Sequence, residues 1–182
     1  MKYLMKNPRG LGLIGLLAGL AVSISANADS SMKTSGPSTV SKDDMEFFQK
    51  AAQTGMLEVQ AAAIASSRAL APATKSFAGT MTTDHSANND ALKALAASKG
   101  VTLPAQLDEE HRELLEKLQK EEPREFDATY AKAMTNGHKE AIELFNETAK
   151  ETKDADIRTF AKSTLPTLQH HLEMAKHLNG KN

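Results

Sequence analysis

Apolar residues recur every three to four positions from residue 41 almost to the end of the chain, which is the spacing of one face of an α-helix. Residues that cap or break helices divide this pattern into four long segments and one short segment. The pattern predicts helices over residues 41–69, 72–99, 105–120, 123–152 and 154–178. Aromatic residues make up only 4% of the chain, and we predict no strand.

The lengths of the connections predict how these helices are arranged. Short turns near residues 71 and 153 make the helices on either side antiparallel neighbours, whereas the longer segment around the short helix can cross one end of the structure. We therefore predict an all-α fold, an antiparallel four-helix bundle with an extra short helix in the crossover. An open helical array is the alternative, which the lack of an internal repeat disfavours.

The first 40 residues have the pattern of a targeting segment followed by a linker. Three cations (Lys2, Lys6 and Arg9) precede an apolar run over 11–22, and Ala26-Asn27-Ala28 has the small residues of a cleavage site. This pattern predicts a signal peptide over 1–28, a flexible leader over 29–40 and a helical domain over 41–179. The expected location is the periplasm or the exterior, including association with the outer membrane. The alternative is an uncleaved anchor; after cleavage we expect no membrane span.

Charge and composition exclude several function classes. The chain has 22 Lys and Arg residues against 23 Asp and Glu, and it contains no Cys. The missing thiols exclude cysteine catalysis, iron–sulfur clusters and disulfides. The balanced charge and few aromatics argue against a nucleic-acid partner.

One ligand-type residue lies on the predicted inward face of each long helix. These residues are Glu58, His85, His138 and His171, and each is surrounded by apolar or small residues of the same face. Counted from the predicted turns, the four lie at about the same height, with His171 offset by about 4.5 Å. We therefore expect them to meet near the middle of the helices.

Two interpretations of this meeting point stay open. Three imidazoles and a carboxylate are suitable ligands for one transition-metal ion, such as Zn, Cu, Fe or Mn. A metal-free polar layer that fixes the register of the helices is the other interpretation. Nearby methionines (Met81, Met134 and Met174) would favour Cu(I), although methionine is also a common core residue.

Other polar residues are assigned supporting or unrelated roles. Asp84 adjoins His85 and is predicted to orient a neighbouring histidine. Asp127 and Tyr130 are predicted to tie the end of the bundle to the crossover segment. His111 is expected to pack or cap the short helix, and His170 to face solvent.

Four blocks carry a family resemblance: EFFQKAAQTGMLEVQ, FAGTMTTDHSANNDALKALAASKGV, FDATYAKAMTNGHKEAIELF and LPTLQHHLEMAKHL. Together they resemble the family of domains of unknown function 4142 (DUF4142), over about residues 41–178. The resemblance implies an exported bacterial protein with a ferritin-like helical bundle, and no settled activity. The family's motif positions fall on Glu58, Asp84, His85, Asp127, Tyr130, His138 and His171.

The sequence leaves three hypotheses for function. The first is an exported protein that binds one metal ion for envelope metal handling or stress protection. The second is a structural module that meets an envelope protein partner. The third is a metal-dependent enzyme, which the chain supports least: it lacks a nucleophile elbow, a phosphate loop and an H-E-x-x-H motif. Thr82 and Leu168 stand where a di-iron centre of the ferritin type needs glutamates.

Overall fold

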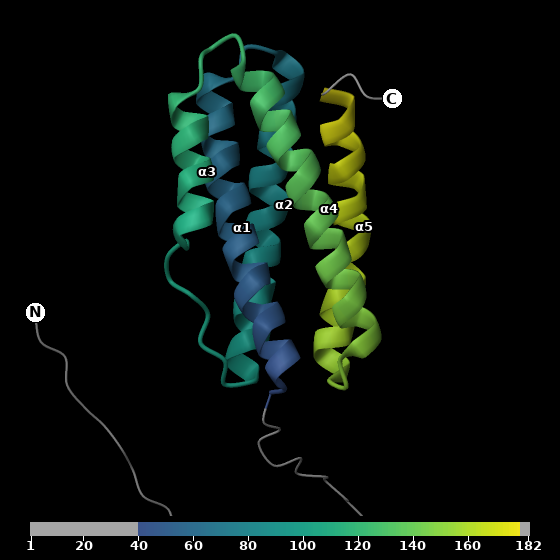
Figure 1. Cartoon of the computed structure of the whole chain (residues 1–182). Coiled ribbons are helices and arrows are strands. Elements are labelled where there is room, and N and C mark those ends of the chain that lie inside the picture. Colours follow the sequence, from purple (N-terminus) through teal and green to yellow (C-terminus); the bar gives the residue numbers. More distant parts are fainter. Residues whose placement is uncertain (1–39, 179–182) are drawn as a thin grey trace, which may run out of the picture. The chain divides into compact units, whose positions relative to one another are not determined.

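The computed structural model describes residues 40–178, which form five helices and no strand (Figure 1). They are α1 (Lys42–Arg68), α2 (Pro72–Ser98), α3 (Glu109–Lys120), α4 (Phe126–Glu151) and α5 (Ala155–Leu178). The all-α prediction is therefore confirmed. The predicted signal peptide and nearly all of the predicted leader lie outside the described residues.

Two helices, α3 and α4, begin at least three residues later in the structure than the sequence predicts. The start of α3 moves to Glu109 because the Asp108 side chain caps it, accepting a hydrogen bond of 3.0 Å from the backbone N–H of His111. Gln53 of α1 holds the preceding crossover residues in a non-helical path, bonding Gln106 O and Asp108 N. Before α4, residues 123–125 form a turn in place of a first helical turn.

The start of α1 and the end of α2 show how particular residues determine where a helix begins and ends. Ser41 accepts a hydrogen bond of 3.0 Å from the backbone N–H of Asp44, and its hydroxyl donates to the Asp44 carboxylate. Gly100 ends α2 in the left-handed region, with a φ of 69°, where a side chain would be strained.

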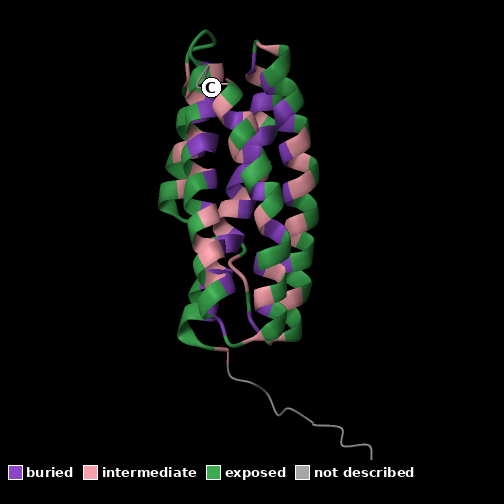
Figure 2. Ribbon diagram, turned by 90° about the vertical axis from the view of Figure 1, so that its right-hand side faces the viewer, coloured by how far each residue is buried: buried purple, intermediate pink, exposed green. Residues whose placement is uncertain are grey.

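The chain runs along α1 and back along α2, and later along α4 and back along α5 (Figure 1). These two pairs pack against each other through α1 with α4 and α2 with α5, while α3 lies on α1. Figure 2 shows the buried residues on the faces that the helices turn toward one another. None of the helices in 40–178 is long and apolar enough to span a membrane.

The buried apolar residues form two clusters rather than one continuous core. One cluster contains Phe77, Met81, Phe126, Tyr130 and Met134, and the other contains Phe47, Leu92, Phe145, Ile157 and Leu168. On α2, α4 and α5, a stretch that holds one buried histidine separates the two clusters. On α1 one cluster ends at Ala52 and the other begins at Leu57, and the buried Glu58 directly follows Leu57. The polar residues predicted to meet therefore occupy a layer between two apolar clusters.

Candidate metal centre

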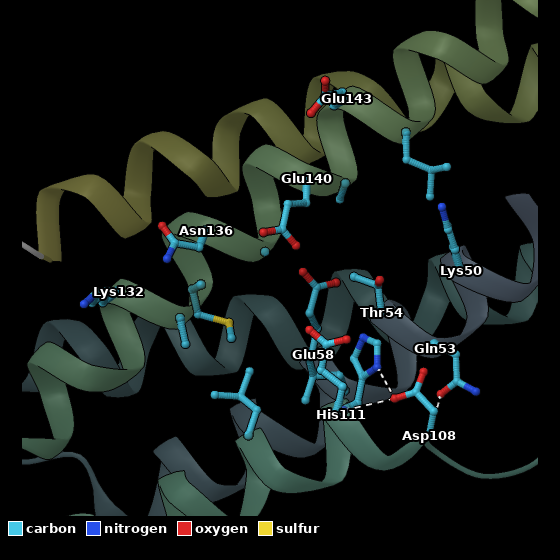
Figure 3. Close-up of a pocket in the computed structure, with 18 of the residues that line it drawn as sticks. Lys50, Gln53, Thr54, Glu58, Asp108, His111, Lys132, Asn136, Glu140 and Glu143 are labelled. Carbon is cyan, nitrogen blue, oxygen red and sulfur yellow. Dashed lines mark hydrogen bonds and ion pairs between the residues drawn. The ribbon is translucent and has the colours of Figure 1, made fainter.

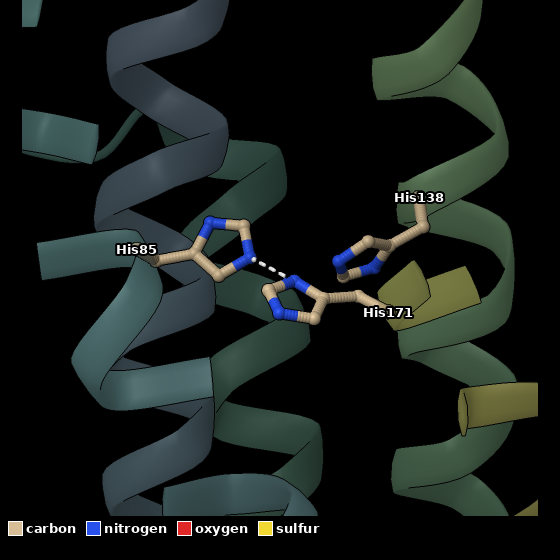
Figure 4. Close-up of side chains that lie close together, drawn as sticks. All are labelled: His85, His138 and His171. Carbon is tan, nitrogen blue, oxygen red and sulfur yellow. Dashed lines mark hydrogen bonds between the residues drawn. The ribbon is translucent and has the colours of Figure 1, made fainter. Parts of the chain in front are cut away.

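Three helices each bring one histidine to this polar layer (Figure 4). His85 comes from α2, His138 from α4 and His171 from α5, and each contributes a possible ligand atom within 4.8 Å of the others. Their side chains are almost completely buried. We call these three residues the histidine cluster.

Two of the histidines are oriented by carboxylates. His85 Nδ1 lies 2.8 Å from Glu58 Oε2, and His171 Nε2 lies 2.9 Å from Asp84 Oδ2. An ionised carboxylate only accepts hydrogen bonds, so each of these ring nitrogens carries the proton that is donated. In the neutral rings, His85 Nε2 and His171 Nδ1 are then left with lone pairs, as in carboxylate–histidine–metal arrangements.

The third histidine is oriented by the backbone. His138 Nδ1 donates to the carbonyl of Met134, one turn earlier on α4, at 2.8 Å. Its Nε2 is therefore a lone pair in the neutral ring, and this buried atom has no hydrogen-bond partner among the described residues. Burial lowers the pKa of His138, which keeps the ring neutral at pH 7.

The two facing nitrogens of His85 and His171 are 3.1 Å apart. A tetrahedral ion with Zn–N bonds of about 2.05 Å would hold two such nitrogens about 3.3 Å apart. Alternatively, one proton shared between them satisfies both atoms. The arrangement can thus hold either a cation or a proton at the same place.

Charge in the layer is concentrated on one pair. Burial disfavours the charged form of Glu58, but the facing histidines outweigh it and hold the pKa of this carboxyl below its ordinary value. Burial also disfavours the charged form of His85, yet the adjacent Glu58 carboxylate raises the pKa of His85. Burial lowers the pKa of His171. One proton on His85 therefore completes a hydrogen-bonded chain from Glu58 through His85 and His171 to Asp84.

Glu58 differs from its predicted place in the ligand set. Its Oε2 accepts from His85 Nδ1, and its Oε1 lies 3.5 Å from His138 Nδ1. Both are the outer nitrogens of their rings, on the side away from the other two histidines. The carboxylate thus stands behind the histidine cluster, where it orients His85. A fourth ligand position facing the three lone pairs is not taken by Glu58.

Asp127 differs from its predicted role, whereas Tyr130 shares an apolar cluster with Leu115 and Leu118 of α3, the helix of the crossover. Asp127 Oδ2 accepts hydrogen bonds from the backbone N–H groups of Leu70 and Ala71, so it ties α4 to the α1–α2 turn and not to the crossover. Tyr130 is buried in an apolar cluster against Phe77 and Phe126. Burial, together with the charge of Glu58, raises the pKa of Tyr130.

The other histidines and the methionines lie outside the cluster. His111 Nδ1 is 2.6 Å from Asp108 Oδ1 at the start of α3, and His170 is exposed. Met81 and Met134 are buried in the apolar cluster that adjoins the layer, and Met174 packs against it. The sequence analysis did not predict the contact between His138 Nδ1 and the Met134 carbonyl. The spacing could have indicated it, because the carbonyl four residues before a helical histidine can accept a hydrogen bond from the Nδ1 of that histidine.

Two cavities approach the layer from different sides. The α1–α4 cavity, of about 1080 Å³, lies between α1, α3 and α4 and reaches Glu58 (Figure 3). The α2–α5 cavity, of about 350 Å³, lies between α2 and α5 and reaches His85 and Asp84. Both sides of the layer are therefore approached from the surface.

Comparison with known proteins gives a family and one structural relative. The model of a family described as a domain of unknown function (DUF4142) matches residues 29–178. No curated protein matches the sequence. The crystal structure of a DUF305 fragment from Deinococcus radiodurans is similar, with a TM-score of 0.70 and 12% identity over 80% of this chain and 100% of that one. At this identity the likeness shows a shared helical fold alone.

Proposed function

The chain belongs to the DUF4142 family, and we propose that it binds one transition-metal ion through His85, His138 and His171. The observation that carries this proposal is His138 Nε2, a buried acceptor without a partner among the described residues that sits in a group of three converging imidazoles. An unpaired buried acceptor costs free energy, which a bound cation would recover.

The donor set defines the class of ion. Three neutral imidazoles suit Zn, Cu, Fe or Mn, and the two carboxylates behind them would raise the basicity of the rings. Three protein ligands leave a fourth position, which water or a small molecule would occupy. Glu58 and Asp84 would hold the ring orientations, and the ion would sit where the shared proton otherwise lies.

We further propose that the protein acts outside the cytoplasm, in metal handling or stress protection of the bacterial envelope. The basic, apolar and small-residue pattern of residues 1–28 supports export. The pairing of α1 with α2 and of α4 with α5 supports an antiparallel four-helix bundle of the ferritin-like kind. Cell fractionation, with N-terminal sequencing that finds Asp29 as the first residue, tests the export proposal.

A second candidate function is a metal-free module with an architectural polar layer and an envelope protein partner. The observation that favours it is the hydrogen-bonded chain from Glu58 to Asp84, which a single proton completes without any metal. In this candidate the layer would fix how the helices align, and the exposed faces would contact the partner.

Metal analysis separates the two candidates. The parent chain, purified without chelator, is compared with His138→Ala and with His170→Ala, which removes an exposed histidine from the same region. We expect about one equivalent of metal in the parent and in His170→Ala, and none in His138→Ala. A parent that stays metal-free after dialysis against Zn²⁺, Cu²⁺, Mn²⁺ and Fe²⁺ contradicts the metal proposal.

A further inference from the structure

The α2–α5 cavity is a small opening between the two helices that carry His85 and His171. Its walls come from Asp84 to Ala91 on α2 and from Phe160 to Leu168 on α5. His85 itself lines it, so the cavity contacts one proposed ligand directly. This inference rests on the proposed metal function.

The polar atoms of this cavity are mostly oxygens. Its polar lining residues besides His85 are Asp84, Asn88, Ser163, Thr164 and Thr167, and no Lys or Arg is among its lining residues. Thr164 Oγ1 lies 3.0 Å from Asn88 Oδ1, which bridges α5 and α2 across the cavity. One negative charge among neutral oxygens is the surrounding that a hydrated divalent cation prefers.

The size of the cavity also fits such a cation. Six waters of about 30 Å³ each need about 180 Å³, and the cavity holds about 350 Å³. A cation with its first hydration layer can therefore enter before it loses water.

Asp84 connects the cavity to the histidine cluster. Its Oδ2 accepts from His171 Nε2 at 2.9 Å, while the side chain remains 39% exposed. A cation bound next to Asp84 would thus be separated from His171 only by the Asp84 carboxylate. His85 lines the same cavity. The cavity leads from solvent to His85, which lines it, and to Asp84, which holds the Nε2 side of the His171 ring.

The larger α1–α4 cavity is less suited to this role. None of the three cluster histidines lines it, and it meets the layer at Glu58, whose Oε2 is engaged by His85. Its lining holds three lysines, Lys50, Lys117 and Lys132, and six carboxylates. Of these carboxylates, Glu140 and Glu143 lie on α4 (Figure 3). Charge does not disfavour a cation there; what this cavity lacks is a cluster histidine among its lining residues.

We propose that the α2–α5 cavity is the site where a hydrated divalent cation first binds, and from which it passes to the histidine cluster. Asp84 supplies the charge that attracts the cation, and Asn88 and Thr164 supply neutral oxygens. Transfer brings the ion to the facing nitrogens of His85 and His171, which lie 3.1 Å apart.

Two matched charge variants test this route. Thr167→Lys places an ammonium at the mouth of the α2–α5 cavity, and Asn136→Lys places one at the α1–α4 cavity; both positions are exposed and helical. Uptake of Co²⁺ by the full chain is followed by stopped-flow absorption at low ionic strength, and its stoichiometry by dialysis. Coulomb repulsion over about 8 Å in water predicts roughly fivefold slower uptake for Thr167→Lys. Asn136→Lys should match the parent, and all three chains should reach the same stoichiometry.

A steric variant provides an independent readout. Ala91→Leu narrows the α2–α5 cavity at an exposed position without changing charge. It should slow uptake at all salt concentrations, whereas the effect of Thr167→Lys should fade in about 0.5 M salt because of screening.

The outcomes distinguish the route from the function itself. Normal stoichiometry with equal uptake rates in Thr167→Lys, Ala91→Leu and the parent overturns the route and leaves the metal site standing. Slow uptake confined to Asn136→Lys also overturns it, in favour of the α1–α4 cavity. A parent that binds no Co²⁺ at equilibrium overturns both proposals.

Discussion

Replacing His138 with leucine removes the one unpaired ring nitrogen of the cluster while keeping a side chain of similar volume. Because His138 is completely buried, the change exposes no surface and leaves little cavity. In the absence of metal we expect His138→Leu to be more stable than the parent, which is unusual for a buried position.

The magnitude follows from the contacts of the ring. Burying Nε2 without a partner costs the parent about 1–3 kcal/mol. The substitution loses the hydrogen bond from Nδ1 to Met134 O, which contributes about 0.5–1.5 kcal/mol. Leucine also has a higher helix propensity than histidine, by a few tenths of a kcal/mol. The sum predicts a gain of about 1 kcal/mol, or roughly 4 °C in Tm for a domain of this size.

Metal should reverse this order of stability. An ion present at about 100 times its Kd stabilises the parent by about 2.7 kcal/mol, and it cannot stabilise a variant that lacks the site to the same extent. The assay is thermal and urea unfolding of the parent, His138→Leu and the control His170→Leu, each with chelator and with Zn²⁺. The control should follow the parent in both conditions.

Two results would refute this reasoning. A loss of more than about 1 kcal/mol in His138→Leu with chelator would mean that the imidazole stabilises the fold, as an architectural layer requires. Equal stabilisation of both chains by Zn²⁺ would mean that the ion binds elsewhere.

Three further predictions concern the support of the site and of the fold. Asp84→Asn should lower metal affinity about 10- to 100-fold by loosening His171, measured by competition titration, whereas the exposed Asp90→Asn on the same helix should not. Gly137→Ala should raise the free energy of unfolding by about 0.5–1 kcal/mol in urea, because the new Cβ would meet open space on α4. Gly55→Ala should stabilise the fold less, because its Cβ would lie 2.0 Å from Asn89 Oδ1 and the Asn89 amide must move. For Asp154, burial opposes ionisation, but hydrogen bonds from Lys99 and from backbone N–H groups outweigh it and lower the pKa below its ordinary 3.8. Its contribution is therefore present above about pH 4 and lost as the pH falls through the lowered pKa. In urea unfolding, Asp154→Asn should cost up to about 1 kcal/mol at pH 7, and this cost should shrink as the pH is lowered below about 4.

The helices and the meeting of the histidines could be predicted because both depend on local spacing. A period of 3.6 residues places His85, His138 and His171 on inward faces, and short turns align their heights. Contacts that depend on how one helix is rotated against another could not be predicted in this way. That rotation decides whether Glu58 approaches Nδ1 or Nε2 of His85. It also decides that Asp127 binds the α1–α2 turn and not the crossover.

The start of α3 depends on a long-range contact that the pattern of its own residues does not contain. Gln53 fixes the crossover from a different helix, and this leaves Asp108 as the cap. Local helix signals alone therefore place the start too early. The same reason applies before α4, where residues 123–125 turn before the helix begins.

The contacts between the two helix pairs bear on why the histidines are buried at all. Asp127 of α4 binds the α1–α2 turn at one end, and Lys99 at the end of α2 binds Asp154 before α5 at the other, at 2.6 Å. These contacts align the pairs without help from the polar layer. A layer kept only for alignment would also be expected to satisfy all its atoms, since each unpaired one costs stability. Two atoms of the layer, His138 Nε2 and Glu58 Oε1, are left unpaired by the described residues, and a bound ion would satisfy the one that faces the other imidazoles, His138 Nε2.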